Sequence, residues 1–228
     1  MKILKSHHFT SLPLIFSATM LFSSCLTSKR MNAFISDQYN NEIPRVNKRT
    51  QPANIFYTPP IHSDADISVT TAHTRILPLI VYWVIDDRKT STLNPGIAAA
   101  DFENTINKIA YKGLMQKLNG QRLELAVQQA PCTFALVDKT HAVWLIYAIH
   151  WEKVYIEPQP SDLVVSYRLS QQDGSSKSGT ITIKNPERNK NLGFFQSWRS
   201  AVSQHLEDYD SNMTDMTKEF VDELMKQL

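Results

Sequence analysis

Apolar residues recur along this chain at two spacings, and each spacing predicts a different kind of element. Alternation at every second residue indicates half-buried strands, and a short apolar run and a long aromatic run add two further candidates. These strand candidates cover 67–71, 123–127, 134–137, 142–156, 163–169 and 181–183. Because the last three follow one another closely, with a turn predicted at 171–176, we expect them to form an antiparallel meander.

The run 76–85 is almost continuously apolar and ends at the charged stretch 86–89. Apolar residues on both faces predict a central strand that is covered on both sides. Pro78 implies either a bulge or a strand that starts after it. The run is too short to cross a bilayer, which requires about 20 apolar residues.

Apolar residues three and four positions apart predict two helices. The first spans about 100–119, with Asp101 as its N-cap and Asn119-Gly120 as its C-cap. The second covers 198–224, and its unbroken phase favours one long helix despite the poor helix formers at 208–212. Together the elements predict an α+β fold, with an antiparallel sheet of about four to six strands packed by these two helices.

Residues 25–62 show no apolar period and are rich in Asn, Gln, Pro and basic residues. Such a segment cannot bury enough apolar surface to offset its ordering entropy, so we expect a flexible tether. The folded part is then a single domain over 63–228, and 1–24 is a separate segment.

That first segment has the features of a secretory signal. Lys2 and Lys5 precede an apolar stretch at 12–22, and the small residues Ser23 and Ser24 precede Cys25. The stretch resembles the lipobox signal of bacterial lipoproteins. The resemblance implies cleavage before Cys25 and attachment of diacylglycerol and palmitate there, which would anchor the protein to a membrane. An ordinary cleaved signal with a chance cysteine, or a short uncleaved anchor, are the alternatives.

The residues after Cys25 carry a second resemblance. Lipoproteins kept at the inner membrane usually have Asp next to the cysteine, and surface-exported ones an acidic cluster. This chain has Leu26 and no acidic residue before Asp37. Both comparisons imply the periplasmic face of the outer membrane.

Charge argues against nucleic acid as a partner. The chain has 24 Lys and Arg against 22 Asp and Glu, and loss of Lys2 and Lys5 would leave the remainder formally neutral. A nucleic-acid-binding protein would carry a basic excess. Hydrophobic residues make up 42% of the chain, which is sufficient for a globular core.

Candidate chemistry is sparse in this sequence. No phosphate loop, dinucleotide fingerprint or nucleophile elbow occurs, and the histidines have no zinc-ligand spacing. We therefore predict no catalytic, cofactor or metal site. Asp86-Asp87 could serve as an acid–base pair but fits the polar end of a strand better. Cys132, beside an apolar run, is better explained as a buried small hydrophobe than as a nucleophile.

The order of elements gives a third resemblance, based on 102–118, 144–183 and 198–224. It is similar to the layout of periplasmic auxiliary lipoproteins of envelope transport, including the lipopolysaccharide-assembly lipoprotein and those of lipid-transport ABC systems. The resemblance implies a non-enzymatic accessory or binding subunit of an envelope protein complex. A lipid or small-ligand carrier, with a cleft between sheet and long helix, is the alternative, and an unrecognised hydrolase a third.

Overall fold

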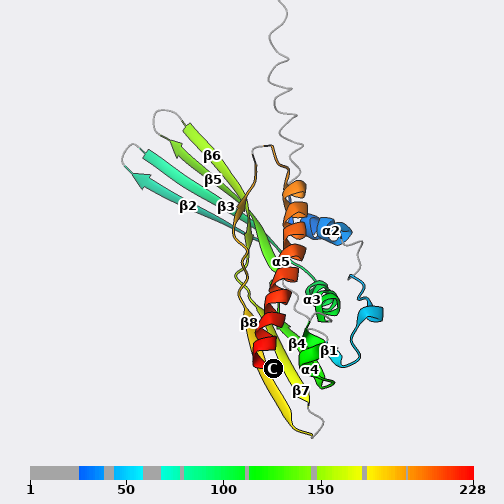
Figure 1. The fold of residues 1–228 in the computed structure, drawn as a ribbon. Coiled ribbons are helices and arrows are strands. Elements are labelled where there is room, and N and C mark those ends of the chain that lie inside the picture. Colours follow the sequence, from blue (N-terminus) through cyan, green and yellow to red (C-terminus); the bar gives the residue numbers. More distant parts are fainter. Residues whose placement is uncertain are drawn as a thin grey trace, which may run out of the picture.

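The computed structural model describes residues 26–38, 44–58, 68–77, 80–110, 113–144, 148–170, 174–193 and 195–228, with the backbone alone at 68–77. The chain forms helices and two β-sheets, and the predicted α+β class is confirmed (Figure 1). The elements are α2 (Ser28–Gln38), η1 (Lys48–Thr50), β1 (Ile55–Thr58), β2 (Ser68–Leu77), β3 (Ile80–Thr92), α3 (Pro95–Ile109), α4 (Leu114–Leu118), β4 (Arg122–Gln129), β5 (Thr133–Trp144), β6 (Ala148–Pro158), β7 (Leu163–Ser170), β8 (Ser176–Ile183), β9 (Lys190–Asn191) and α5 (Trp198–Gln227).

The strands are divided between two sheets. One has the order β2-β3-β5-β6-β9 and the other β1-β4-β7-β8, in which β1 runs parallel to β4. The predicted β7–β8 hairpin is present, with pairs from Leu163–Ile183 to Ser170–Ser176. The predicted three-stranded meander is wrong, because β6 pairs with β5 and β9 and so belongs to the other sheet.

Two apolar runs that were expected to be single strands each contain a reversal of the chain. The run 142–156 is divided between β5 and β6, which pair antiparallel up to Trp144–Ala148. The run 76–85 is divided between β2 and β3, and β3 starts after Pro78, as one of the two alternatives predicted. The expectation that this run is covered on both sides is wrong, because Ile80–Val84 are only partly buried and Ile85 is 39% exposed.

The long C-terminal helix is confirmed as one uninterrupted element. α5 covers 30 residues, and the Ser197 side chain accepts a hydrogen bond from the backbone N–H of Ser200 at its start. Its apolar stripe is buried along the whole length in the core, where Phe220 packs against Phe102 of α3 with ring centroids 5.3 Å apart. The predicted cleft beside this helix is therefore filled by side chains.

The helix predicted over 100–119 begins earlier and is divided. Asn94 is its N-cap, through a 2.9 Å hydrogen bond from Gly96, so Asp101 lies inside α3 rather than at its start. Gly113, with φ of 142°, separates α3 from α4. The predicted C-cap is confirmed, since Asn119 has φ of 46° and Gly120 of 80°.

The prediction of a flexible tether is wrong for the segments of 26–58 that the structure describes. α2 packs into the core through Met31 and Ile35, which are 0% and 6% exposed. Asn32 of the same helix accepts a hydrogen bond from Ser91 at 2.5 Å. β1 forms the edge of the four-stranded sheet beside β4. The N-terminal segment is therefore part of the fold.

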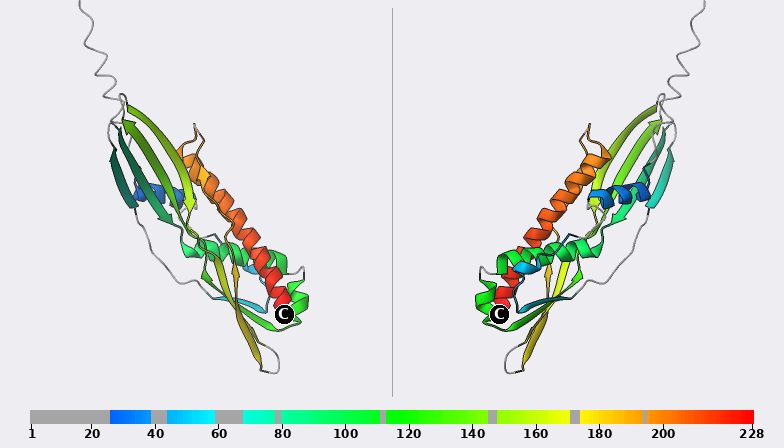
Figure 2. Two further views of the ribbon diagram at one scale, coloured as in Figure 1. Left: turned by 90° about the vertical axis from the view of Figure 1, so that its left-hand side faces the viewer. Right: turned by 90° about the vertical axis from the view of Figure 1, so that its right-hand side faces the viewer.

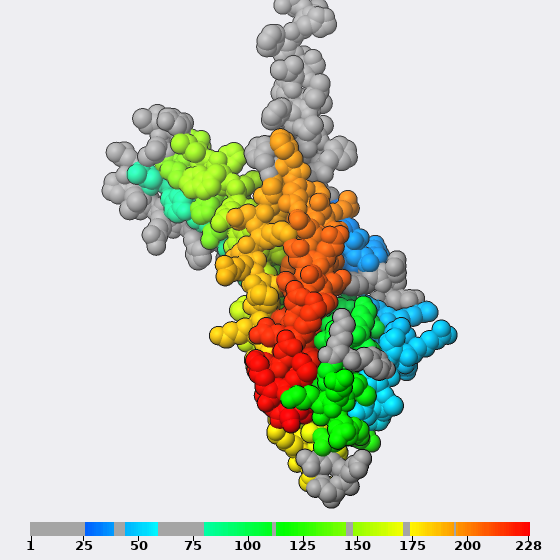
Figure 3. All heavy atoms as spheres, viewed as in Figure 1, coloured from blue at the N-terminus to red at the C-terminus, as the bar shows by residue number. Residues whose placement is uncertain are grey.

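The molecule is elongated because one sheet extends beyond the helices. Strands β2, β3, β5 and β6 run past the upper half of α5 and leave the body of the molecule (Figures 1 and 2). We call this extension the arm, and define it as residues 71–77, 80–86, 139–144 and 148–153 of those strands. In the space-filling view the described part of the arm forms a separate lobe (Figure 3).

Candidate binding surface

The arm leaves large apolar side chains uncovered. Four of them are 39–56% exposed: Ile85, Trp144, Ile149 and Trp151. Bare side chains of this size on a soluble surface mark a site of interaction when they are grouped. The strand register places all four within one short stretch of the sheet.

Both faces of the arm contribute to this surface. Successive side chains of a strand point to opposite faces, and directly paired residues share a face. Trp144 and Ile85 therefore lie on the face that, nearer the body, carries the buried Phe134 and Leu136. Ile149 and Trp151 lie on the opposite face, so large apolar side chains are exposed on both faces of the arm.

An aromatic ladder fixes the orientation of Trp151. Its ring stacks on His141 at a centroid distance of 5.1 Å and an interplanar angle of 5°. His141 Nδ1 in turn forms a 2.8 Å hydrogen bond with the Tyr82 hydroxyl. Because each ring is held by its neighbour, this surface loses little side-chain entropy when it is covered.

Ion pairs lie where the arm joins the body. Arg88 and Glu157 are 2.5 Å apart, Lys89 and Asp87 are also 2.5 Å apart, and Lys139 and Asp86 are 3.9 Å apart. Asp86 and Asp87 are neighbours in β3 and so point to opposite faces of the sheet. They are each near a lysine and do not form the acid–base pair that was considered from the sequence.

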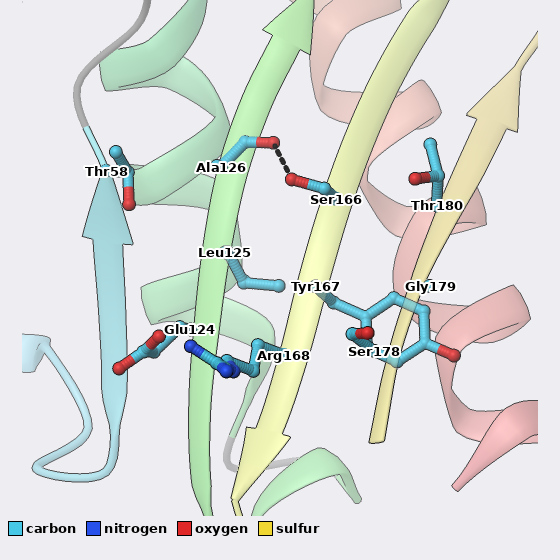
Figure 4. Close-up of a pocket in the computed structure, with 10 residues that line it drawn as sticks. All are labelled: Thr58, Glu124, Leu125, Ala126, Ser166, Tyr167, Arg168, Ser178, Gly179 and Thr180. Atoms are coloured by element: carbon cyan, nitrogen blue, oxygen red, sulfur yellow. Dashed lines mark hydrogen bonds between the residues drawn. The ribbon is translucent and has the colours of Figure 1, made fainter. Parts of the chain in front are cut away.

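A hollow of about 420 Å³ lies on the outer face of the four-stranded sheet (Figure 4). Its polar lining consists of the hydroxyl side chains of Thr58, Ser166, Ser178 and Thr180 together with Glu124 of β4 and Arg168 of β7. Ser166 donates a 3.4 Å hydrogen bond to the Ala126 carbonyl, and Tyr167 lies across Gly179 to donate a 2.7 Å bond to Gln227. Polar residues of this kind are typical of the solvated face of an antiparallel sheet.

A second hollow, of about 340 Å³, lies between α3 and the strands β1 and β4. Lys48, Tyr57, Thr58 and Glu103 are the polar residues among mainly apolar walls. The Tyr57 hydroxyl donates a 2.9 Å hydrogen bond to Asn107. Burial raises the pKa of Tyr57, with a smaller contribution from Glu103, and burial also raises the pKa of Glu103 against the opposing effect of Lys48.

The two cysteines differ in what the structure describes. Cys132 packs against the core and is partly buried, and burial raises the pKa of its thiol. A raised pKa keeps the thiol protonated, which suits a small hydrophobe and disfavours a nucleophile. Cys25 lies outside the described residues. The next residue, Leu26, packs against the core immediately before α2.

Within the ranges that the structure describes, no three His, Cys, Asp or Glu side chains are grouped so as to hold a metal ion. In the same ranges, no helix combines the length and apolar content needed to cross a membrane.

No protein-family model, no curated protein and no solved structure matches this chain.

Sequence reasoning missed the arm, although a signal for it exists. No Asp, Glu, Lys or Arg occurs in 76–85 or in 141–151. Two uncharged runs of this kind, each long enough for two short strand segments, are compatible with two apolar hairpins lying side by side. The interpretation of each run as one long strand missed the reversals, and the interpretation of 76–85 as a covered central strand gave that run a cover that the fold does not supply.

Proposed function

We propose that the chain is a non-enzymatic accessory protein of the bacterial envelope, anchored through acylated Cys25, which binds a further envelope component through the arm. The observation that supports it is the arm itself, with Trp144, Ile149 and Trp151 each 46–56% exposed on its two faces. Exposed apolar area of this kind is costly in water and is covered in the functional state. Its place on a preformed sheet gives a binding surface that needs little ordering.

The arm is also separate from the rest of the core. It lies at one end of an elongated molecule, away from the four-stranded sheet (Figure 1). A component that docks there does not require any change in the packing of α3 against α5. This arrangement fits an accessory or binding subunit of an envelope protein complex, which is the role that the resemblance to auxiliary lipoproteins implies.

The anchor is tested by acyl labelling. In cells grown with an alkyne fatty acid, the natural protein should be labelled, because the proposed acyl chains are attached at Cys25. The Cys25→Ala variant should carry no label. Cys132→Ala is the matched control and should keep the label. A labelled Cys25→Ala protein, or an unlabelled natural one, would remove the anchor from the proposal.

The docking role is tested by photo-crosslinking in cells. A photoreactive phenylalanine derivative at Ile149 should give crosslinked adducts, because this side chain is 46% exposed on the arm. The same group at Thr180, exposed on the outer face of the four-stranded sheet, is the control and should give few. Equal yields at the two positions would contradict docking through the arm.

The alternative function, a lipid or small-ligand carrier, would use a different site from the predicted cleft at the long helix, namely the hollow between α3 and the strands β1 and β4. Its volume of about 340 Å³ is at the lower end of ligand sites in proteins. Apolar walls with Tyr57, Glu103 and Lys48 would suit a small amphipathic molecule. Native mass spectrometry of the purified chain distinguishes the two, because a tightly held ligand adds its own mass.

A further inference from the structure

The surface chemistry of the arm changes in order from the body to the free end. Paired residues across β2, β3, β5 and β6 form successive rungs of the sheet. The two inner rungs contain the charged residues Asp86, Lys139, Glu152 and Lys153. The next three contain the aromatic and imidazole side chains of Tyr82, Trp83, His141, His150 and Trp151. The last rung that is described in all four strands pairs Ile76, Val81, Trp144 and Ala148, and the pair Leu77–Ile80 lies beyond it.

Charge is almost absent from the four outer rungs. Among their described residues, 73–76, 81–84, 141–144 and 148–151, Arg75 of β2 is the one residue of the Asp, Glu, Lys or Arg type. The composition of these described outer rungs therefore suits an apolar surrounding.

The order of these zones matches the profile of a membrane surface. Trp and Tyr concentrate at the level of lipid headgroups, apolar side chains lie deeper, and charged side chains stay in water. We propose that the outer end of the arm inserts into the interfacial region of a lipid bilayer.

The two-sided exposure favours lipid over a protein partner. A protein interface covers one patch and surrounds it with a polar rim. Here Trp144 and Ile149, on opposite faces and in adjacent rungs, are 56% and 46% exposed. A lipid bilayer surrounds an inserted hairpin on all sides and would therefore cover both of these side chains at once.

The strand edges limit the depth of insertion. β2 is the edge of its sheet, and β9 pairs with β6 only at Tyr155 and Ile156. Unpaired backbone groups are costly in hydrocarbon, so only the outermost rungs enter and the aromatic zone stays at headgroup depth. Leu26, the first residue after Cys25, packs on the folded core, so an acylated Cys25 would hold the domain close to the same bilayer.

The inference rests on the proposed function, since it names lipid as the component that the arm binds. Three of the four tryptophans, Trp83, Trp144 and Trp151, lie on the arm, and Trp198 lies in α5. In the full chain carrying Trp198→Phe, the tryptophan fluorescence therefore comes from the arm alone. In a second full chain with the three arm tryptophans replaced by Phe, the fluorescence comes from Trp198 in the body.

Both chains are bound to vesicles of phosphatidylcholine and phosphatidylglycerol that contain brominated acyl chains, and flotation measures the bound fraction. At equal bound fraction, the arm emission should fall at least two-fold relative to unbrominated vesicles, while the Trp198 emission should stay unchanged. Unquenched arm emission from a fully bound chain overturns the inference.

A second pair of variants tests the insertion without the chain in which all three arm tryptophans are replaced. Ile149→Asp in the Trp198→Phe chain places a carboxylate in an outer rung and should reduce the quenching at least two-fold. Thr180→Asp in the same chain is the control and should leave it unchanged. Photo-crosslinking of position 149 to a protein, without quenching by lipid, would refute lipid insertion and leave the proposed function standing. If position 149 gives no crosslinked adduct and the arm emission is not quenched by brominated lipid, both the lipid insertion and the proposed docking role are refuted.

Discussion

Met31→Asp should destabilise the protein by about 3–5 kcal/mol, the usual cost of an uncompensated buried charge. Met31 is fully buried and lies in the single core cluster that also contains residues of α3 and α5. The measurement is the free energy of unfolding from a urea titration followed by circular dichroism.

Ala33→Asp is the matched control, because Ala33 lies two residues further along α2 and is exposed. Its effect should stay within about 0.5 kcal/mol, as for surface substitutions in general. If both variants unfold at the same urea concentration as the natural chain, α2 does not contribute to the fold, and a tether model for this segment would apply.

Acid should weaken the protein through His205, which is 5% exposed and packs on Phe134 with ring centroids 4.4 Å apart. Burial lowers the pKa of His205 from 6.5 to about 4, with Asp208 opposing and Lys190 adding to this effect. A histidine with a lowered pKa in the folded state is protonated more readily in the unfolded chain. Its contribution to stability is therefore complete above pH 6.5 and lost as the pH falls through 4.

The size of this effect is about 3 kcal/mol, because each pKa unit corresponds to roughly 1.4 kcal/mol. Asp101 has the opposite effect on the pH dependence of stability. Burial, and secondarily Asp210, raise the pKa of Asp101 to about 6. Protonation of Asp101 therefore stabilises the fold as the pH falls from about 6 to 4.

Comparison with His205→Leu isolates the histidine. Leu is apolar and does not titrate, whereas Asp101 titrates in both chains. The difference in unfolding free energy between the natural chain and the variant should shift by about 3 kcal/mol in favour of the variant from pH 7 to pH 4. A constant difference over this range would show that His205 is not held neutral by burial.

The elements that the sequence predicts well are those with a long period or a strong local signal. α5 keeps its apolar phase over 30 residues, so no other assignment competes with it. β4, β7 and β8 alternate clearly, and the left-handed pair Asn119-Gly120 marks the end of α4. In each case the information lies within a few neighbouring residues.

The elements that the sequence misses depend on distant contacts. In α2, Met31 and Ile35 are buried and Phe34 packs against the core, and this short helix is stabilised by packing against β3 and α5. β1 has four residues and pairs with β4, which lies more than 60 positions further on. Short segments of this kind have no period long enough to detect.

The division into two sheets was also beyond local reasoning. β6 and β7 are separated by only a few residues, and proximity favours pairing between them. The structure instead pairs β6 with β5, through eleven residue pairs from Phe134–Pro158 to Trp144–Ala148. The missing signal is the turn at the end of this hairpin, because the sequence there has no Gly, Pro, Asn or Asp to indicate a reversal.

The position of α5 has a consequence for biosynthesis. This helix is translated after every other described element, and its side chains are buried in the core from Ala201 to Leu224. The hydrophobic core that α5 shares with α3 and the sheets therefore stays incomplete until this helix has left the ribosome, so the earlier elements cannot bury their apolar faces fully before then.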